Sequence, residues 1–161
     1  MVCVGIDVAK DKHDCFILSS EGVVLADAFT IANNREGFEM LLQRIRTCTR
    51  PTDNIKVGLE ATGHYSYNLL GFLLEKGMPP FLINPLHTNL YRKSLSLRQT
   101  KTDRIDARTI ASMLMSDVDL KSYTDTLYHN EELKSLTKES IGKKQQYQVY
   151  QAVSRHSPKL L

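Results

Sequence analysis

The order of strand-like and helix-like segments is the feature that most constrains the fold of this chain. Three strand-like segments come first, and Glu-Gly at 21–22 suits a hairpin turn between the last two. These segments cover residues 2–9, 13–20 and 23–32. Two more, 55–61 and 79–85, each follow a helix-like segment, and such a strand joins its sheet in parallel by a right-handed crossover. The order predicts an α/β fold whose mixed sheet has three antiparallel and two parallel strands flanked by helices.

Helical spacing of apolar residues is clear in three segments. In 35–46 the apolar residues are Phe38, Leu41, Leu42 and Ile45, and Asn33 or Asn34 can cap the helix. Segment 64–77 aligns Tyr67, Leu70 and Leu74 and ends at Gly77. Segment 102–117 has a stripe made of Ala107, Ile110, Ala111 and Leu114. A polar, basic loop with a helical turn near 87–95 is expected before it. This topology resembles the RNase H-like fold.

The C-terminal part of the chain has a different pattern. Residues 131–157 are predicted to form a polar helix whose thin apolar seam contains Leu133, Leu136 and Ile141. One helix of that polarity gains little stability alone, so we expect it to pair with another copy in a homo-oligomer. The sequence therefore predicts an α/β domain at 1–120 and a helical connector, the start of a coiled coil, at 121–161.

Two carboxylates lie where strand-like segments should have buried side chains. Asp7 shares its face of the first strand with Gly5 and Ala9, and Glu60 is flanked in the same way by Gly58 and Thr62. Small neighbours leave space around each acid. A carboxylate on a packed face must be paired, hydrogen-bonded or bound to metal. If the first and fourth strands are neighbours, the two acids face each other and repel unless a cation lies between them.

A second pair of acids begins the helix at 102–117. Asp103 and Asp106 are three residues apart and lie on or beside its apolar stripe, so they should approach the same end of the sheet. Four carboxylates suit Mg²⁺ or Mn²⁺, and zinc is disfavoured because no His or Cys is among them. We predict that Asp7, Glu60, Asp103 and Asp106 are metal ligands and catalytic residues. Two ions in such a site can assist in-line phosphodiester displacement.

Each acid also has an ordinary structural interpretation. Asp103 can be a helix N-cap, with Thr102 as the alternative, and Asp106 a favourable acid of the first turn. Asp7 can pair with Lys10 or Lys12 at a strand end. Glu60 can form a salt bridge at a loop, while Asp11 and Asp14 are interpreted as turn and solvent-face acids. The coincidence of four acids on suitable elements favours the metal site.

Positive charge is concentrated beside the second acid pair. The chain has a net charge of +3, and segment 91–108 holds six Lys and Arg against two Asp. Such a segment suits a polyanion, although a solvated face explains it equally well. The predicted contacts to a phosphate backbone are Arg92, Lys93, Arg98, Lys101, Arg104 and Arg108.

Composition and the N-terminus bear on the compartment. Hydrophobic residues make up 42% and charged residues 24% of the chain, which is typical of a globular domain. No apolar run approaches the roughly 20 residues of a membrane helix, and the N-terminus does not have the pattern of a signal peptide. Three cysteines without metal-ligand spacing are expected to be thiols. We predict a cytoplasmic protein that does not bind membranes.

The motifs "GIDVAKDKHD", "GLEATGHY", "INP" and "TKTDRIDARTIA" resemble the N-terminal half of the DEDD-type transposases of bacterial insertion sequences. This family includes the Piv-type site-specific DNA invertases. The resemblance covers residues 1–140 and maps the four family acids onto Asp7, Glu60, Asp103 and Asp106. It implies an RNase H-like domain of the Holliday-junction-resolvase type that uses divalent metal and acts on DNA. In relatives, a non-coding RNA expressed from the element guides the choice of DNA site.

The chain departs from this family in length. Full members continue through a helical segment into a second domain with a serine proposed as nucleophile, and this chain stops at "SRHSPKLL". Ser154 and Ser157 do not match that motif. We therefore expect an expressed fragment or a truncated gene, incomplete for recombination without the second domain.

Two other classes remain as alternatives. The first is a fragment of an actin-like or sugar-kinase-like ATPase, because "GIDVAK" resembles the first phosphate loop of those proteins. That class does not explain the Asp-x-x-Asp helix. The second is a nucleic-acid-binding module without chemistry, for which metal would be immaterial.

Overall fold

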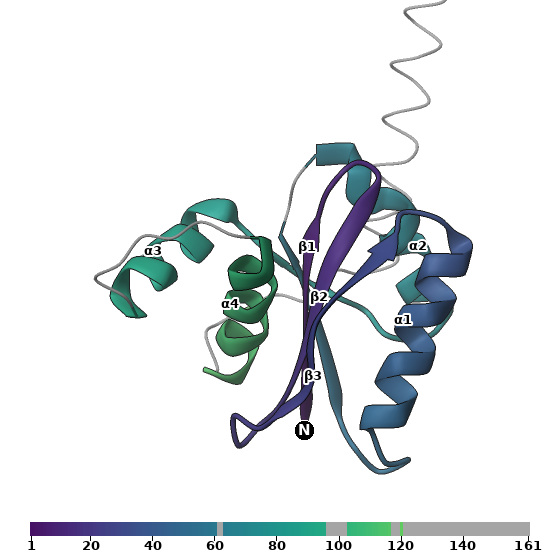
Figure 1. Cartoon of the computed structure of the whole chain (residues 1–161), viewed down its shortest axis with the longest axis horizontal. Helices are drawn as coiled ribbons and strands as arrows, with labels where there is room; N and C mark the ends of the chain where they lie inside the picture. Colours follow the sequence, from purple (N-terminus) through teal and green to yellow (C-terminus); the bar gives the residue numbers. More distant parts are fainter. Residues whose placement is uncertain (61–62, 96–102, 117–119, 121–161) are drawn as a thin grey trace, which may run out of the picture. The chain divides into compact units, whose positions relative to one another are not determined.

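The computed structural model describes residues 1–60, 63–95, 103–116 and 120, with the backbone alone at 95 and 103–105. It contains a five-stranded sheet in the order β3-β2-β1-β4-β5 (Figure 1). The strands are β1 (Val2–Val8), β2 (Lys12–Ser19), β3 (Val24–Ala32), β4 (Ile55–Glu60) and β5 (Phe81–Ile83). β2 pairs antiparallel with β1 and β3, whereas β4 pairs in parallel with β1 and β5. The predicted mixed sheet is confirmed.

Helices cover both faces of the sheet (Figure 1). One face carries α1 (Arg35–Cys48) and α2 (Tyr67–Glu75), which meet through Phe38 and Phe72. The other face carries α4 (Asp103–Met115), and α3 (Pro85–Leu95) lies beyond α4, on the side away from the sheet. No helix of the described residues is long and apolar enough to cross a membrane. The predicted helix at 131–157 lies outside the described residues.

Helix α1 has the predicted buried stripe. Phe38, Leu41, Leu42 and Ile45 are all buried. Of the two candidate caps, Asn34 is the N-cap, since its side chain accepts a hydrogen bond of 2.9 Å from the Gly37 amide. The neighbouring Asn33 is therefore not needed as a cap and makes other contacts.

Two segments differ from their predicted form. The predicted stripe of α2 was partly wrong: Leu69, Leu70, Phe72 and Leu73 are buried, while Tyr67 and Leu74 are partly exposed. A 3-10 helix, η1 (Gly63–Ser66), precedes α2 and changes the phase of the helical pattern. The predicted loop after β5 is an 11-residue helix, α3. Pro85 suits its first turn, and the Asn84 side chain accepts a hydrogen bond from the Leu86 amide.

The three cysteines are free thiols, as predicted. Cys3 and Cys15 are buried, and burial raises the pKa of both thiols above the usual value. Because the thiolate is the reactive form, these two residues act as core side chains rather than as nucleophiles.

Helix α4 packs very closely on β1 and β4. Its predicted stripe is confirmed, since Ala107, Ile110, Ala111 and Leu114 are at most 2% exposed. A methyl group at Gly5 would lie 2.5 Å from the Ala111 backbone nitrogen and nearer still to the Ala107 carbonyl oxygen. One at Gly58 would lie 3.0 Å from a Leu114 methyl group. The glycines thus make room for α4, which the sequence interpretation, based on space beside each acid, did not foresee.

Candidate metal centre

Asp7 and Glu60 occupy equivalent positions on neighbouring parallel strands. The last paired residues of β1 and β4 are Ile6 and Leu59, and each acid is the next residue along its strand. Both acids are half-buried. Alternation places Asp7 on the face of Gly5 and Glu60 on the face of Gly58, which is the face covered by α4. The structure therefore brings these two predicted residues together, as the sequence indicated.

Asp14 adds a third acid that the sequence interpretation assigned to the solvent face. In the ladder between β1 and β2, Asp14 lies directly opposite Asp7. Its alternate neighbours Phe16 and Leu18 pack against Ala107 and Ala111 of α4, so Asp14 lies on the same face. The Thr30 hydroxyl donates a hydrogen bond to it. The sequence does not show that Asp14 lies opposite Asp7, because it does not fix the length of the turn between their strands. The strand register in the structure shows it.

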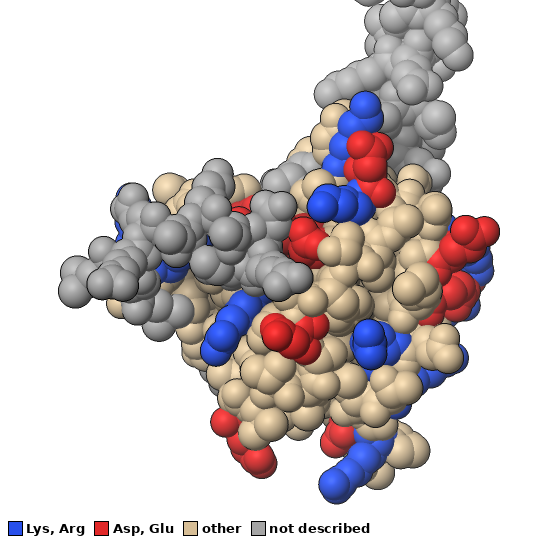
Figure 2. Space-filling model, viewed as in Figure 1, with Lys and Arg blue, Asp and Glu red and all other residues tan. Residues whose placement is uncertain are grey.

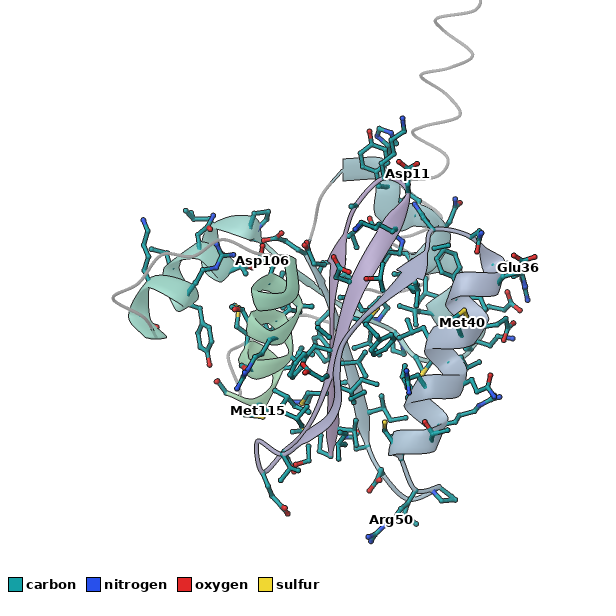
Figure 3. All side chains as sticks on the ribbon, in the orientation of Figure 1. Asp11, Glu36, Met40, Arg50, Asp106 and Met115 are labelled. Atoms are coloured by element: carbon teal, nitrogen blue, oxygen red, sulfur yellow. The ribbon has the colours of Figure 1, made fainter. Side chains whose placement is uncertain are left out.

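Asp106 lies at the N-terminal end of α4 and is 7% exposed. Figure 3 places Asp106 toward the same end of the sheet as Asp11 of the β1–β2 turn, while Met115 lies at the opposite end. Asp103 is the first residue of α4, one turn before Asp106, and its side chain lies outside the described part. Helix α4 thus brings its acid-bearing end toward the end of the sheet where Asp7 and Glu60 are found.

The Asp106 carboxylate forms an ion pair with Arg92 of α3. The side chains are 10% and 19% exposed, so most of the pair is removed from water. Sequence reasoning made Arg92 a phosphate contact and missed this partner. Residue spacing does not reveal this ion pair, because the pair joins two separate helices and the sequence predicted a loop with a helical turn in place of α3.

The structure describes the side chains of only some of the other basic residues that were predicted to contact DNA. Lys93 and Arg108 are exposed, and the Arg108 guanidinium lies 5.6 Å from the centroid of the Phe16 ring. Arg98 and Lys101, together with the side chain of Arg104, fall outside the described residues. On the face shown in Figure 2, lysines and arginines alternate with acids and do not merge into one patch.

Asn33 and His13 support the turn that follows Asp7. The Asn33 side-chain nitrogen donates to the carbonyls of Lys10, at 2.8 Å, and Tyr65, at 3.2 Å. His13 is fully buried, and its Nδ1 accepts a hydrogen bond from the Ala9 amide. Burial lowers the pKa of His13, so the neutral ring is favoured. The sequence pointed to Asn33 only as an alternative helix cap, and it contains no motif that predicts these contacts of Asn33 and His13.

The carboxylate oxygens near Asp7 suit the predicted metal by their chemistry. Carboxylate oxygens are the ligands that Mg²⁺ and Mn²⁺ prefer, and the acids around Asp7 fit that preference. Among the side chains that the structure describes, however, no three acids, histidines or cysteines are close enough to hold an ion. Asp103 is not among those side chains. The fit of these acids to the metal thus rests on the chemistry of their oxygen atoms.

The fold defines the class of protein to which this chain belongs. A solved structure of Thermus thermophilus RuvC resembles it with a TM-score of 0.50, at 14% identity, over 76% of this chain and 99% of that one. At such low identity the likeness shows the fold alone, which is RNase H-like. A family model for DEDD transposases of the IS110 type, described as a transposase, matches residues 4–153, and the chain belongs to this family.

Curated relatives carry related descriptions. The pilin gene-inverting protein of Moraxella bovis is 35% identical over 109 residues, which are 67% of this chain and 32% of that protein. The mini-circle putative transposase for IS117 of Streptomyces coelicolor is 30% identical over 118 residues, which are 73% of this chain and 28% of that protein. The chain thus spans about a third of the length of the curated relatives it matches.

Proposed function

We propose that this chain is the metal-dependent catalytic domain of a transposase or site-specific recombinase that cleaves and transfers DNA strands. The observation that carries the proposal is the row of carboxylates from Asp14, Asp7 and Glu60, across three neighbouring strands on one face. Like charges opposite each other destabilise a sheet unless a cation or hydrogen-bond donors compensate. Membership of a transposase family supports DNA as the substrate.

The proposed ligands are Asp7, Glu60, Asp103 and Asp106, and the proposed ion is Mg²⁺ or Mn²⁺. A bound divalent ion would activate the attacking oxygen and neutralise the leaving one. Strands β1 and β4 carry Asp7 and Glu60, and helix α4, which packs on Gly5, carries the other two acids. A carboxylate has two oxygens, so Asp106 can accept from Arg92 and still coordinate a cation.

The basic segment would hold a phosphate backbone beside these acids. We propose Lys93, Arg98, Lys101, Arg104 and Arg108 as contacts to DNA, and Arg92 as one that must first leave Asp106. We also propose that an element-encoded guide RNA binds the protein. Residues 121–161 would form a helical connector, and its helix at 131–157 would join copies of the chain into a homo-oligomer. The second domain expected from the family is the reason to propose that this chain alone is incomplete.

Metal titration by isothermal calorimetry tests the site. The unaltered chain should bind Mn²⁺, and Asp7→Asn and Glu60→Gln should each weaken binding at least about tenfold, since outer-shell changes alone cost roughly 10–100-fold. The matched control is Asp53→Asn, at the other end of β4. Asp53 accepts a hydrogen bond from the Arg50 amide, and asparagine can accept the same bond. The Mn²⁺ affinity of this variant should therefore equal that of the unaltered chain.

Unchanged affinity in both Asp7→Asn and Glu60→Gln would remove the metal assignment and favour a binding module without chemistry. Stabilisation by ATP that survives Asp106→Ala would favour the ATPase alternative instead.

Salt dependence tests the contacts to DNA. Binding to a short duplex should weaken steeply as salt rises, and Arg98→Ala/Lys101→Ala should lower the slope of log K against log salt by about two, one per phosphate contact. Arg46→Ala/Arg50→Ala removes the same charge elsewhere. Arg46 lies in the last turn of α1 and Arg50 two residues after the helix, and Figure 3 labels Arg50 at the end of the domain opposite Asp11. An equal change of slope in this control would show that net charge, and not the segment 92–108, determines binding.

A further inference from the structure

Asn33 connects the two chain segments that follow the strand-borne acids. Its side-chain nitrogen donates to the Lys10 carbonyl, three residues after Asp7, and to the Tyr65 carbonyl, five residues after Glu60. Its backbone amide donates to the Asp11 carbonyl at 2.9 Å. One residue at the junction of β3 and α1 thus holds both the β1–β2 turn and η1.

The ladder between β1 and β4 ends just before the acids, at Ile6 and Leu59. Among the described residues, direct pairing of β1 with β4 thus stops before the acids, although Asp7 still pairs with Asp14 of β2 and Glu60 with Ile83 of β5. Asp7 and Glu60 lie between the end of the ladder on one side and the Asn33 bridge on the other. A bridge at that position restricts how far the two carboxylates can move apart.

His13 contacts the β1–β2 turn from the buried side. Its ring is fully buried, stacks on Phe38 with centroids 6.0 Å apart, and accepts from the Ala9 amide at 3.3 Å. With Nδ1 as the acceptor, the neutral ring carries its proton on Nε2. The β1–β2 turn is thus tied to the folded core by His13 and to η1 by Asn33.

We propose that Asn33 is a positioning residue that sets the spacing of Asp7 and Glu60 for cation binding. A primary amide suits this task because its single nitrogen has two hydrogens, one for each carbonyl. Aspartate has nearly the same shape but no hydrogens to donate when ionised. The proposal rests on the proposed function, because it takes the two acids to be ligands.

The test compares the same chemical change at two adjacent positions. Asn33→Asp removes both donated bonds and adds a negative charge. Asn34→Asp adds the same charge at the next residue but keeps the cap of α1, since aspartate is also a favourable N-cap that can accept from the Gly37 amide. Asn33→Leu removes the bridge without adding charge.

Two measurements on the whole chain decide the matter. Hydrogen exchange should become faster in both 8–12 and 63–67 for Asn33→Asp and Asn33→Leu, and should stay unchanged there for Asn34→Asp. Mn²⁺ affinity, measured by calorimetry below the unfolding temperature of each variant, should fall about 10–100-fold in the two Asn33 variants, as for other groups that orient ligands. A merely structural residue would lower the melting temperature without this loss of affinity.

Faster exchange in only one segment, or Mn²⁺ affinity equal to that of the unaltered chain, would overturn the role of Asn33. The titration of Asp7→Asn separates this from failure of the proposed function. If Asp7→Asn weakens binding and Asn33→Leu does not, only the positioning role is lost. If Asp7→Asn binds Mn²⁺ as tightly as the unaltered chain, the metal site itself is rejected, and the positioning role with it.

Discussion

Gly5→Ala should destabilise the domain by about 3 kcal/mol, the upper part of the range for adding a methyl group to a packed core. The added carbon would collide with the Ala107 carbonyl oxygen and lie 2.5 Å from the Ala111 nitrogen. Both obstacles are backbone atoms of α4, which cannot rotate away as a side chain can. Helix α4 must shift away from β1, and urea denaturation should show the loss in the free energy of unfolding.

Gly58→Ala is the matched control for this substitution. Gly58 pairs with Gly5 in the ladder between β1 and β4, and its added methyl group would meet the Leu114 and Ile110 side chains at 3.0–3.1 Å. Side chains can change rotamer, so the expected cost is only about 1 kcal/mol. Equal losses for the two variants would contradict the close approach of the α4 backbone to β1. Because α4 carries two of the proposed ligands, Gly5→Ala should also weaken Mn²⁺ binding more than Gly58→Ala does.

Breaking the Arg92–Asp106 pair should have an effect of similar size. Asp106→Ala removes the carboxylate from a guanidinium that is 19% exposed, and Arg92→Met removes the guanidinium from a carboxylate that is 10% exposed. Removing one member of a buried pair costs about 3–5 kcal/mol, because the other charge stays out of water. The double variant has no such orphan and should be less destabilised than the sum of the two single variants.

Chemical denaturation of the four proteins in this cycle measures the coupling. Tyr91→Phe is the control, since it removes the exposed hydrogen bond of 3.1 Å between Tyr91 and Ser116, another link between α3 and α4. Its expected cost is about 1 kcal/mol or less. Additive losses for Arg92→Met and Asp106→Ala would show that the two side chains do not interact in solution.

Much of the fold could be predicted because it depends on short-range spacing. Alternation identified β1, and helical spacing identified the buried faces of α1 and α4. The element order predicted that β4 joins the sheet in parallel, and the structure pairs it with β1, which places Asp7 beside Glu60. The α2 stripe was partly wrong, and α3 was expected only as a helical turn near 87–95. For α2, the preceding 3-10 helix η1 displaces the start of the helix. For α3, the apolar residues do not mark a buried face, since Leu86 and Leu90 are exposed.

From the amino-acid sequence one could derive the strands and helices, the acids that can lie at one end of the sheet, and the family that the motifs resemble. The strands, the helices and the positions of the acids follow from apolar periodicities of about two and 3.6 residues and from local turn signals, whereas the family rests on the resemblance of the motifs. Four features required the folded chain: Asp14 lies opposite Asp7, Arg92 pairs with Asp106, Asn33 connects the β1–β2 turn to η1, and Gly5 leaves room for α4. Each of these depends on strand register or on packing between separate elements, and neither is encoded in local spacing.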